Sequence, residues 1–73
     1  MAKIMGLIGL IHAQFDSESA FADHIGWPRQ RLNRITTGVQ PPTLADVQDI
    51  ANGLSVPFML VANFFLETKS TNV

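Results

Sequence analysis

Glycine and proline divide this chain into short segments at nearly regular intervals. They cluster at residues 26–28, 38–42 and 53–57, and each cluster interrupts a series of apolar residues spaced three and four apart. Proline lacks a backbone N–H and glycine tolerates a left-handed backbone, so such clusters end one helix and begin the next. Apolar residues at this spacing line one face of a helix. The sequence therefore predicts an all-α fold of five short helices.

Capping residues mark where two of these helices begin. Ser17 and Thr43 can each accept a hydrogen bond from a free N–H of a first helical turn, and Asp46 stands three residues after Thr43, the spacing of a capping box. Pro28 suits the first position of the third helix, where no N–H is needed. The predicted helices cover about residues 4–15, 17–26, 28–37, 43–53 and 57–66, and residues 68–73 are expected to form a frayed tail.

Length and the lack of cysteine limit how the fold can be stabilised. The 73 residues are enough for one domain with one core, so residues 1–73 are interpreted as a single domain. Without cysteine, neither a disulfide nor a thiolate metal site can form. Hydrophobic residues make up 47% of the chain and charged residues only 15%, where an average soluble domain carries about 25% charged residues. Part of the apolar excess is expected to be buried against a second chain.

Two apolar runs were compared with membrane and targeting segments. Residues 4–13 contain His12, and residues 56–66 contain Pro57 and Asn63. Both runs are far shorter than the roughly 20 apolar residues that a membrane-spanning helix needs. They are interpreted as helices of a soluble domain, and no membrane partner is expected.

The second and third predicted helices have the spacing of a helix-turn-helix over residues 17–37. Ala22 is small enough for two helices to cross closely, and Gly26, four residues later, can adopt the positive φ of the turn. Leu32 and Ile35 lie three apart on the third helix and anchor it to the core. These four residues are the predicted packing positions of the motif.

The opposite face of the third helix is polar and basic. It carries Arg29, Gln30, Asn33 and Arg34. Arginine can bind guanine through two hydrogen bonds, and glutamine or asparagine can bind adenine in the same way. This face is therefore the predicted DNA- or partner-binding surface. The alternative for the arginines is a solvated helix face with intramolecular salt bridges.

The stretch from Ser17 to Gly38 resembles the Cro/phage-repressor (XRE-type) helix-turn-helix family, whose domains are lambda-repressor-like. Residues 42–44 and 51–57 are also similar to the family's fourth helix and the approach to its fifth, so the resemblance covers about residues 4–66. It implies a dimer that places two recognition helices in successive major grooves about 34 Å apart. It also implies a transcriptional regulator in the cytoplasm of a bacterial host, Cro-like in size and repressor-like in action.

The resemblance assigns roles to individual positions. Arg29 and Gln30 match the first base-reading positions of the recognition helix, and Asn33 matches a further base contact. Thr37 and the backbone around Gly38 and Gln40 match positions that contact phosphate. The leading hypothesis is thus a small phage-type regulator that presents its third helix to operator DNA as a dimer.

The charge distribution favours a second hypothesis. Residues 29–34 hold three arginines and no acid, whereas the rest of the chain has a net charge of −4, and phosphate neutralisation usually dominates DNA affinity. Glu18 occupies a position where relatives often have a glutamine that reaches DNA, and its carboxylate would repel phosphate. It could instead pair with an arginine of the third helix or complement its own helix dipole. The alternative function is an antirepressor or modulator that binds another repressor protein, with or without DNA. An antitoxin role also occurs on this fold, but no separate toxin-neutralising segment is visible.

The fifth predicted helix is apolar around most of its circumference, which indicates burial on more than one side. In a domain this small, the second side is expected to face either a second copy of this chain in a homodimer or another repressor protein. The predicted surface comprises Phe58, Met59, Val61, Phe64 and Phe65.

Other polar residues do not form a recognisable chemical site. His12 with Asp16, and Asp23 with His24, lack a third ligand at a metal-binding spacing. Ser17 and Ser19 have no base and orienting group. Trp27 is expected to pack at the turn rather than stack on a base. The sequence therefore predicts no enzyme activity, no cofactor and no small-molecule substrate.

Overall fold

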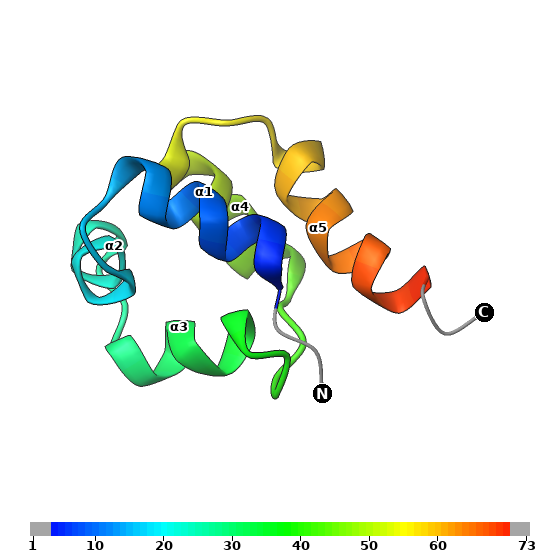
Figure 1. The fold of residues 1–73 in the computed structure, drawn as a ribbon, viewed down its shortest axis with the longest axis horizontal. Helices are drawn as coiled ribbons and strands as arrows, with labels where there is room; N and C mark the ends of the chain where they lie inside the picture. Colours follow the sequence, from blue (N-terminus) through cyan, green and yellow to red (C-terminus); the bar gives the residue numbers. More distant parts are fainter. Residues whose placement is uncertain (1–3, 71–73) are drawn as a thin grey trace.

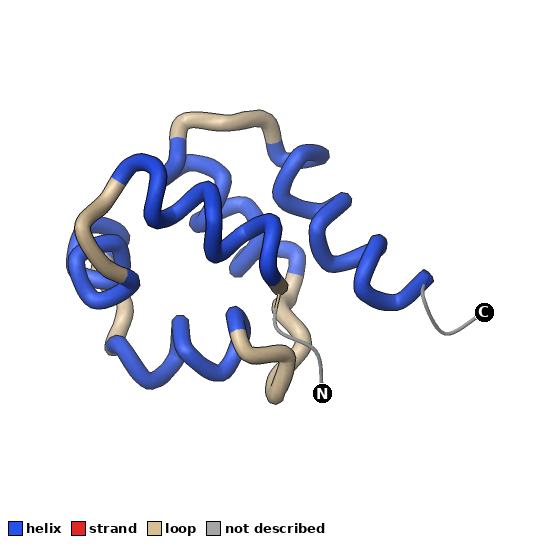
Figure 2. Tube along the Cα trace, in the orientation of Figure 1, coloured by secondary structure: helices blue, strands red, loops and turns tan. Residues whose placement is uncertain are grey.

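Five helices follow one another in the computed structural model, which describes residues 4–70, with side chains for residues 4–66. They are α1 (Met5–Gln14), α2 (Glu18–Ile25), α3 (Arg29–Thr36), α4 (Leu44–Leu54) and α5 (Phe58–Ser70). In Figure 1, α1 lies in front of α4, α2 is seen nearly end-on at one side, α3 lies below, and α5 lies at the other side. Figure 2 shows helices and loops but no strand in the described part. The all-α, five-helix prediction is confirmed.

The turn between α2 and α3 has the expected local geometry. The Ser17 hydroxyl caps α2 by accepting a hydrogen bond from the Ala20 N–H at 3.1 Å. Gly26 ends α2 in the left-handed region, with φ 76° and ψ 25°, a conformation that costs glycine little. Pro28 departs from the prediction: it is the N-cap of α3, with an extended backbone at ψ 141°, and Arg29 is the first helical residue.

The core lies where the first four helices meet, and α5 covers it. The predicted packing residues Ala22, Leu32 and Ile35 are completely buried. Around them lie further buried apolar side chains from every helix, including Leu7, Ile11, Phe21, Ile50, Leu54 and Val61. Burial of these side chains is the main stabilising force available to a chain without disulfides.

Gly53 does not end α4 as predicted but lies within its last turn. The helix continues to Leu54, and Ser55 takes the left-handed conformation at its C-cap, with φ 58°. A Cβ atom at Gly53 would lie 2.3 Å from Cγ2 of Ile25 and 2.9 Å from Cε1 of Phe21. The glycine is thus needed for the close approach of α2 to α4, rather than for a turn.

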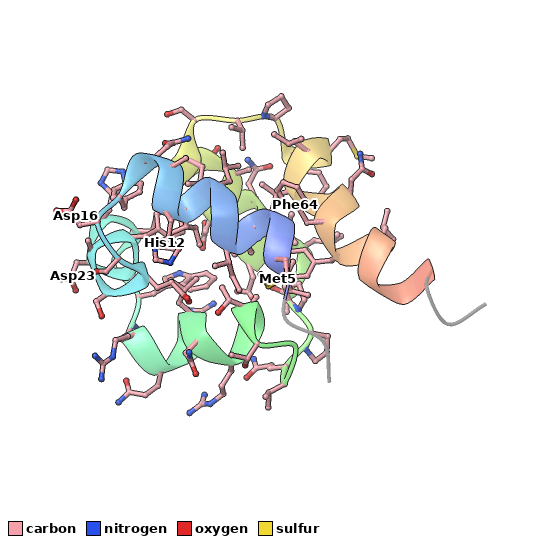
Figure 3. The ribbon with its side chains drawn as sticks, in the orientation of Figure 1. Met5, His12, Asp16, Asp23 and Phe64 are labelled. Carbon is pink, nitrogen blue, oxygen red and sulfur yellow. The ribbon has the colours of Figure 1, made fainter. Side chains whose placement is uncertain are left out.

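Helix α5 extends further than predicted. Its backbone remains helical to Ser70, because the sequence after Pro57 contains neither glycine nor proline to stop it. The expected frayed tail over residues 68–73 is therefore corrected for residues 68–70, and residues 71–73 lie outside the described part. Figure 3 shows Phe64 between α5 and α1. A Cβ atom at Gly6 would lie 2.6 Å from its ring, so glycine at this position of α1 lets the ring pack closely.

Candidate nucleic-acid interface

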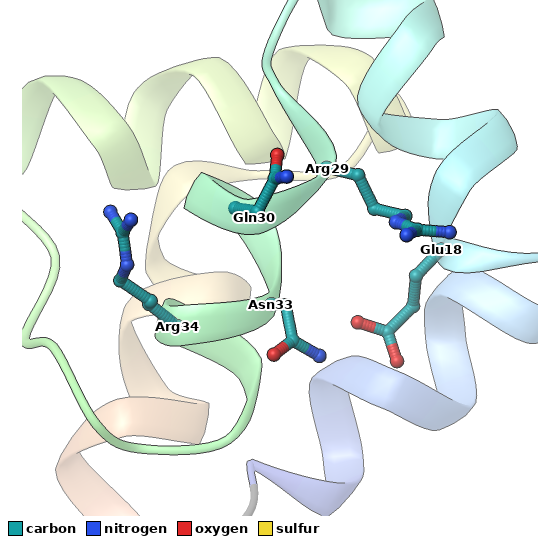
Figure 4. A pocket seen from close by; sticks show the side chains of 5 residues that line it. All are labelled: Glu18, Arg29, Gln30, Asn33 and Arg34. Carbon is teal, nitrogen blue, oxygen red and sulfur yellow. The ribbon is translucent and has the colours of Figure 1, made fainter.

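The exposed face of α3 carries the four side chains that the sequence predicted. Arg29, Gln30, Asn33 and Arg34 are all exposed, and they line one side of a cleft of about 510 Å³ whose other side is Glu18 at the start of α2 (Figure 4). None of these four side chains has a hydrogen-bond or ion-pair partner within the described residues. Their donors and acceptors are therefore available to a ligand.

The third arginine of this helix is used inside the protein. The Arg31 guanidinium forms an ion pair and hydrogen bond with Asp46 of α4, and it lies 4.0 Å above the ring of Trp27. Trp27 is only 7% exposed, as expected for packing at the turn. The positive charge that α3 offers to a partner is therefore two arginines rather than three.

Asp46 links the recognition helix to the rest of the fold. Its carboxylate accepts a hydrogen bond from the Thr43 N–H at 3.1 Å, and the Asp46 N–H donates to Thr43 Oγ1 at 3.0 Å, so the predicted capping box is present. Burial acts to raise the pKa of Asp46, but the hydrogen bond from Thr43 and the nearby charge of Arg31 outweigh it and hold the pKa below its usual value. The charged form of Asp46 is thus stabilised in the folded state.

Glu18 points into the cleft and is held there by a buried hydroxyl. Thr36, whose side chain is fully buried near the end of α3, donates from Oγ1 to Glu18 Oε1 at 2.8 Å. Of the two pairings considered for Glu18, the one with an arginine is not formed among the described residues. Thr36 is a functional residue that was not predicted from the sequence. Its spacing from Leu32 and Ile35 already placed it on the inward face of α3.

The backbone N–H donors of the loop after α3 already have acceptors within the protein. The N–H groups of residues 37–40 donate to carbonyl oxygens of α3 at 3.0–3.2 Å, and the Thr37 hydroxyl donates to the Asn33 carbonyl at 2.7 Å. Gly38 supplies the turn with φ 80°. Of the phosphate contacts predicted around Thr37, Gly38 and Gln40, those from backbone N–H groups already have acceptors within the protein. The Thr37 hydroxyl proton is likewise donated within the protein, so the phosphate contact predicted for Thr37 requires that hydroxyl to rotate. The contact from the Gln40 side chain stays a prediction.

The two ends of α3 differ in how they are held. The Ile4 N–H donates to the Thr36 carbonyl at 2.8 Å, which ties the start of α1 to the end of α3. At its beginning, α3 has no side-chain cap, because Pro28 has no side-chain acceptor. Uncapped N–H groups at the positive end of a helix favour an anion. The start of α3, next to Arg29, is therefore electrostatically suited to phosphate.

A second surface feature is an apolar groove between the start of α4 and one side of α5, with a volume of about 370 Å³. We call it the apolar groove. It is lined by Pro41, Pro42, Leu44, Phe58, Met59 and Phe65, among others. Leu44 is 78% exposed and Met59 is 58% exposed. Val61 was predicted to belong to the interaction surface of the fifth helix. This prediction is wrong, because Val61 is completely buried in the core.

The acidic and histidine residues outside the cleft do not converge. Asp16 and Asp23 both project outward at the α2 end of the molecule, as Figure 3 shows. No group of three or more potential metal ligands occurs within residues 4–66. Among the described helices, none combines the length and apolarity needed to cross a bilayer.

The fold and this surface together define a helix-turn-helix domain, in which α2 supports an α3 whose polar face is exposed. A comparison with protein families agrees: the helix-turn-helix model HTH_3 matches residues 17–60. The chain belongs to this family, which is the Cro/phage-repressor (XRE-type) helix-turn-helix family of DNA-binding transcriptional regulators. Neither a curated protein nor a solved structure matches the chain.

Proposed function

We propose that this chain is a small phage-type transcriptional regulator, which acts in the cytoplasm of a bacterial host and places α3 in the major groove of operator DNA. The observation that carries this proposal is the set of four unpaired polar side chains on one face of α3, namely Arg29, Gln30, Asn33 and Arg34. Two arginines flanking two amides form a suitable group for reading base edges. The uncapped start of α3 supports the same function, since it can bind a phosphate beside the bases.

The working unit in this proposal is a dimer of this chain. Each protomer presents one short recognition helix with two free arginines, which supplies little phosphate neutralisation by itself. Two protomers reading two half-sites double that contribution. The apolar groove supports association, because Leu44 and Met59 together expose apolar surface that water solvates poorly.

The direct test is a titration of the purified chain against duplex DNA from the promoter region of its own gene, at low and at moderate salt. If each free arginine of a dimer displaces one counterion, affinity should fall about 100-fold between about 50 and 200 mM salt. Unrelated duplex DNA of the same length is the control. Equal binding of the two duplexes, or no binding at low salt, would contradict the proposed function.

A second candidate function is an antirepressor or modulator that binds another repressor protein. The specific observation in its favour is that Arg31 is paired with Asp46, which leaves only two free cations on α3 in a chain of net charge −1. Such a surface, together with the apolar groove, also suits a protein partner with an acidic and apolar face. The test is sedimentation of the chain with the repressor encoded beside it. A mixed complex formed without DNA would favour this candidate, and two independent species would exclude it.

A further inference from the structure

The cleft on α3 contains one acidic group among basic and amide groups, and this acidic group has a fixed position. Glu18 Oε1 accepts the hydroxyl of Thr36 at 2.8 Å, which is shorter than the 3.3 Å from that hydroxyl to the Asn33 carbonyl. Thr36 is completely buried, so the donor cannot turn toward solvent. The other carboxylate oxygen of Glu18 has no partner among the described residues. The Glu18 side chain lines the cleft together with Arg29 and Asn33 (Figure 4).

The chemistry of a carboxylate limits what this oxygen can bind. It accepts hydrogen bonds and donates none, and no arginine neutralises it within the described residues. It therefore repels a phosphate and the carbonyl oxygens of guanine and thymine. The major groove offers amino donors on cytosine and adenine only, and in adenine the amino group stands beside N7, which is an acceptor and repels a carboxylate. Cytosine is the base whose edge fits best.

We propose that Glu18 is a specificity-determining residue that selects a cytosine by accepting a hydrogen bond from its amino group, while Arg29 or Arg34 binds a guanine in the same cleft. This inference rests on the proposed binding of operator DNA. In this arrangement the Glu18 carboxylate repels a phosphate but accepts a hydrogen bond from the base pair. The cleft therefore binds a base pair in preference to a phosphate. Thr36 is a positioning residue, because it holds the carboxylate without touching DNA.

The test is selection of bound sequences from a pool of randomised DNA duplexes, using the full chain and three variants. The wild type should prefer cytosine at one position of each half-site by about 10-fold, the range of a good side-chain to base contact. In Glu18→Gln this preference should change to a purine, because the amide oxygen stays on Thr36 and the amide nitrogen that now faces the cleft can only donate, for which N7 of adenine or guanine is an acceptor. Glutamine can still accept from Thr36, so the variant keeps the internal hydrogen bond. Its helix content is checked by circular dichroism.

Two controls separate readout from charge and from folding. Asp23→Asn removes one negative charge from an exposed position of the same helix outside the cleft, so it should raise affinity for all sequences without changing base preference. Thr36→Val removes the buried hydroxyl with little change in volume, so it should weaken the cytosine preference to about 2- to 3-fold without switching it to a purine.

The outcomes distinguish this inference from the function on which it rests. A wild type that selects a sequence motif, with Glu18→Gln selecting the same motif at higher affinity, would show that Glu18 contributes charge only and would overturn the inference alone. A wild type that enriches no sequence would overturn both the inference and the proposed function. A change from cytosine to a purine in Glu18→Gln, absent from Asp23→Asn, would establish Glu18 as a base-reading residue.

Discussion

The α2–α3 surface and the apolar groove differ in how their side chains are supported. On the α2–α3 surface, buried groups hold the polar side chains. Thr36 donates a hydrogen bond to Glu18, and Asp46 forms an ion pair with Arg31. In the apolar groove, Leu44 and Met59 are exposed at 78% and 58%, and they lie among other apolar groups. One region therefore presents a defined pattern of donors and acceptors. The apolar groove presents apolar area, whose contacts have no preferred direction.

This difference indicates two separate tasks within 73 residues. A polar pattern fixed by internal hydrogen bonds discriminates between ligands, because a wrong ligand leaves groups unpaired. An apolar groove provides association energy that depends on area and little on detail. If the two tasks are separate, substitutions in one region should leave the function of the other intact, whereas a substitution between them should damage both.

The largest effect is expected at Gly53, where α2 and α4 approach most closely. In Gly53→Val, the added carbon atoms would overlap Ile25 and the fully buried Phe21, which should lower the free energy of unfolding by about 3 kcal/mol. Urea unfolding followed by circular dichroism measures this loss. Both DNA binding and self-association should weaken together.

The matched control for that prediction is Gly9→Ala on α1. A Cβ atom at Gly9 meets no atom within 4 Å, and alanine is favoured over glycine in a helix by about 0.5–1 kcal/mol, so this variant should be more stable than wild type. A Gly53→Val variant as stable as wild type would show that α2 and α4 can separate without cost.

The next effect separates two arginines on the same helix. Arg29→Ala should reduce operator affinity by about 1–3 kcal/mol and relax specificity at one base pair. Because Arg29 has no partner inside the described structure, the free energy of unfolding of the Arg29→Ala variant should stay within about 0.5 kcal/mol of wild type. Electrophoretic mobility shift and thermal unfolding measure the two quantities.

Arg31→Met is the comparison for Arg29→Ala, since Arg31 is bound to Asp46 and lies over Trp27. We expect this variant to be less stable, with its base preference unchanged. If Arg31→Met alters base preference and Arg29→Ala does not, the assignment of inward and outward arginines is wrong.

A smaller effect is expected from Asp46 and depends on pH. Its pKa is lowered in the folded state, so its contribution to stability is complete above the usual carboxyl pKa of about 3.9 and is lost as the pH falls through the lower folded value. Asp46→Ala, which removes the carboxylate half of the capping box and the ion pair with Arg31, should cost about 1 kcal/mol near pH 7. Unfolding measured from pH 7 to pH 2 should show a smaller acid-induced loss for Asp46→Asn than for wild type.

Asp49→Asn is the control for removing a carboxylate from α4, because Asp49 is exposed on the same helix and forms no ion pair among the described residues. Its free energy of unfolding at pH 7 should stay within about 0.5 kcal/mol of wild type. Equal pH profiles for wild type and Asp46→Asn would mean that Asp46 does not carry the linkage.

The smallest effect on the stability of the monomer is expected in the apolar groove. Met59→Glu places a charge where Met59 is exposed, so the free energy of unfolding of the monomer should change by no more than about 0.5 kcal/mol. The proposed dimer should nevertheless dissociate, because the charge would be buried in the interface without a partner. Sedimentation velocity over a range of concentrations measures this dissociation.

Asn63→Glu adds the same charge at an exposed position of α5 that does not line the groove. It should leave self-association unchanged. A dimer that survives Met59→Glu but not Asn63→Glu would place the interface on another face of α5.

The number and type of helices, the helix-turn-helix motif and most of the recognition face could be predicted from the sequence. These features depend on local rules. Proline and glycine break helices, and Ser17 and Thr43 cap them. Helical spacing places Leu32 and Ile35 on one face of the third helix and the polar side chains on the opposite face. Errors arose where one residue type serves two purposes. Gly53 resembled a helix end because glycine is common there, yet it provides space for Phe21 and Ile25.

Which charged groups face outward was decided only by the tertiary structure. Arg29, Arg31 and Arg34 have the same charge and lie within six residues, and no local rule distinguishes the one that pairs with Asp46, fifteen residues away. The contact between Glu18 and Thr36 spans eighteen residues, and the burial of Val61 depends on how α5 packs on α1 and α4. The sequence alone determined where helices form, because hydrogen bonds within a helix join near neighbours. The packing of those helices determined which side chains remain free to bind a partner, because burial and ion pairing join residues that are distant along the chain.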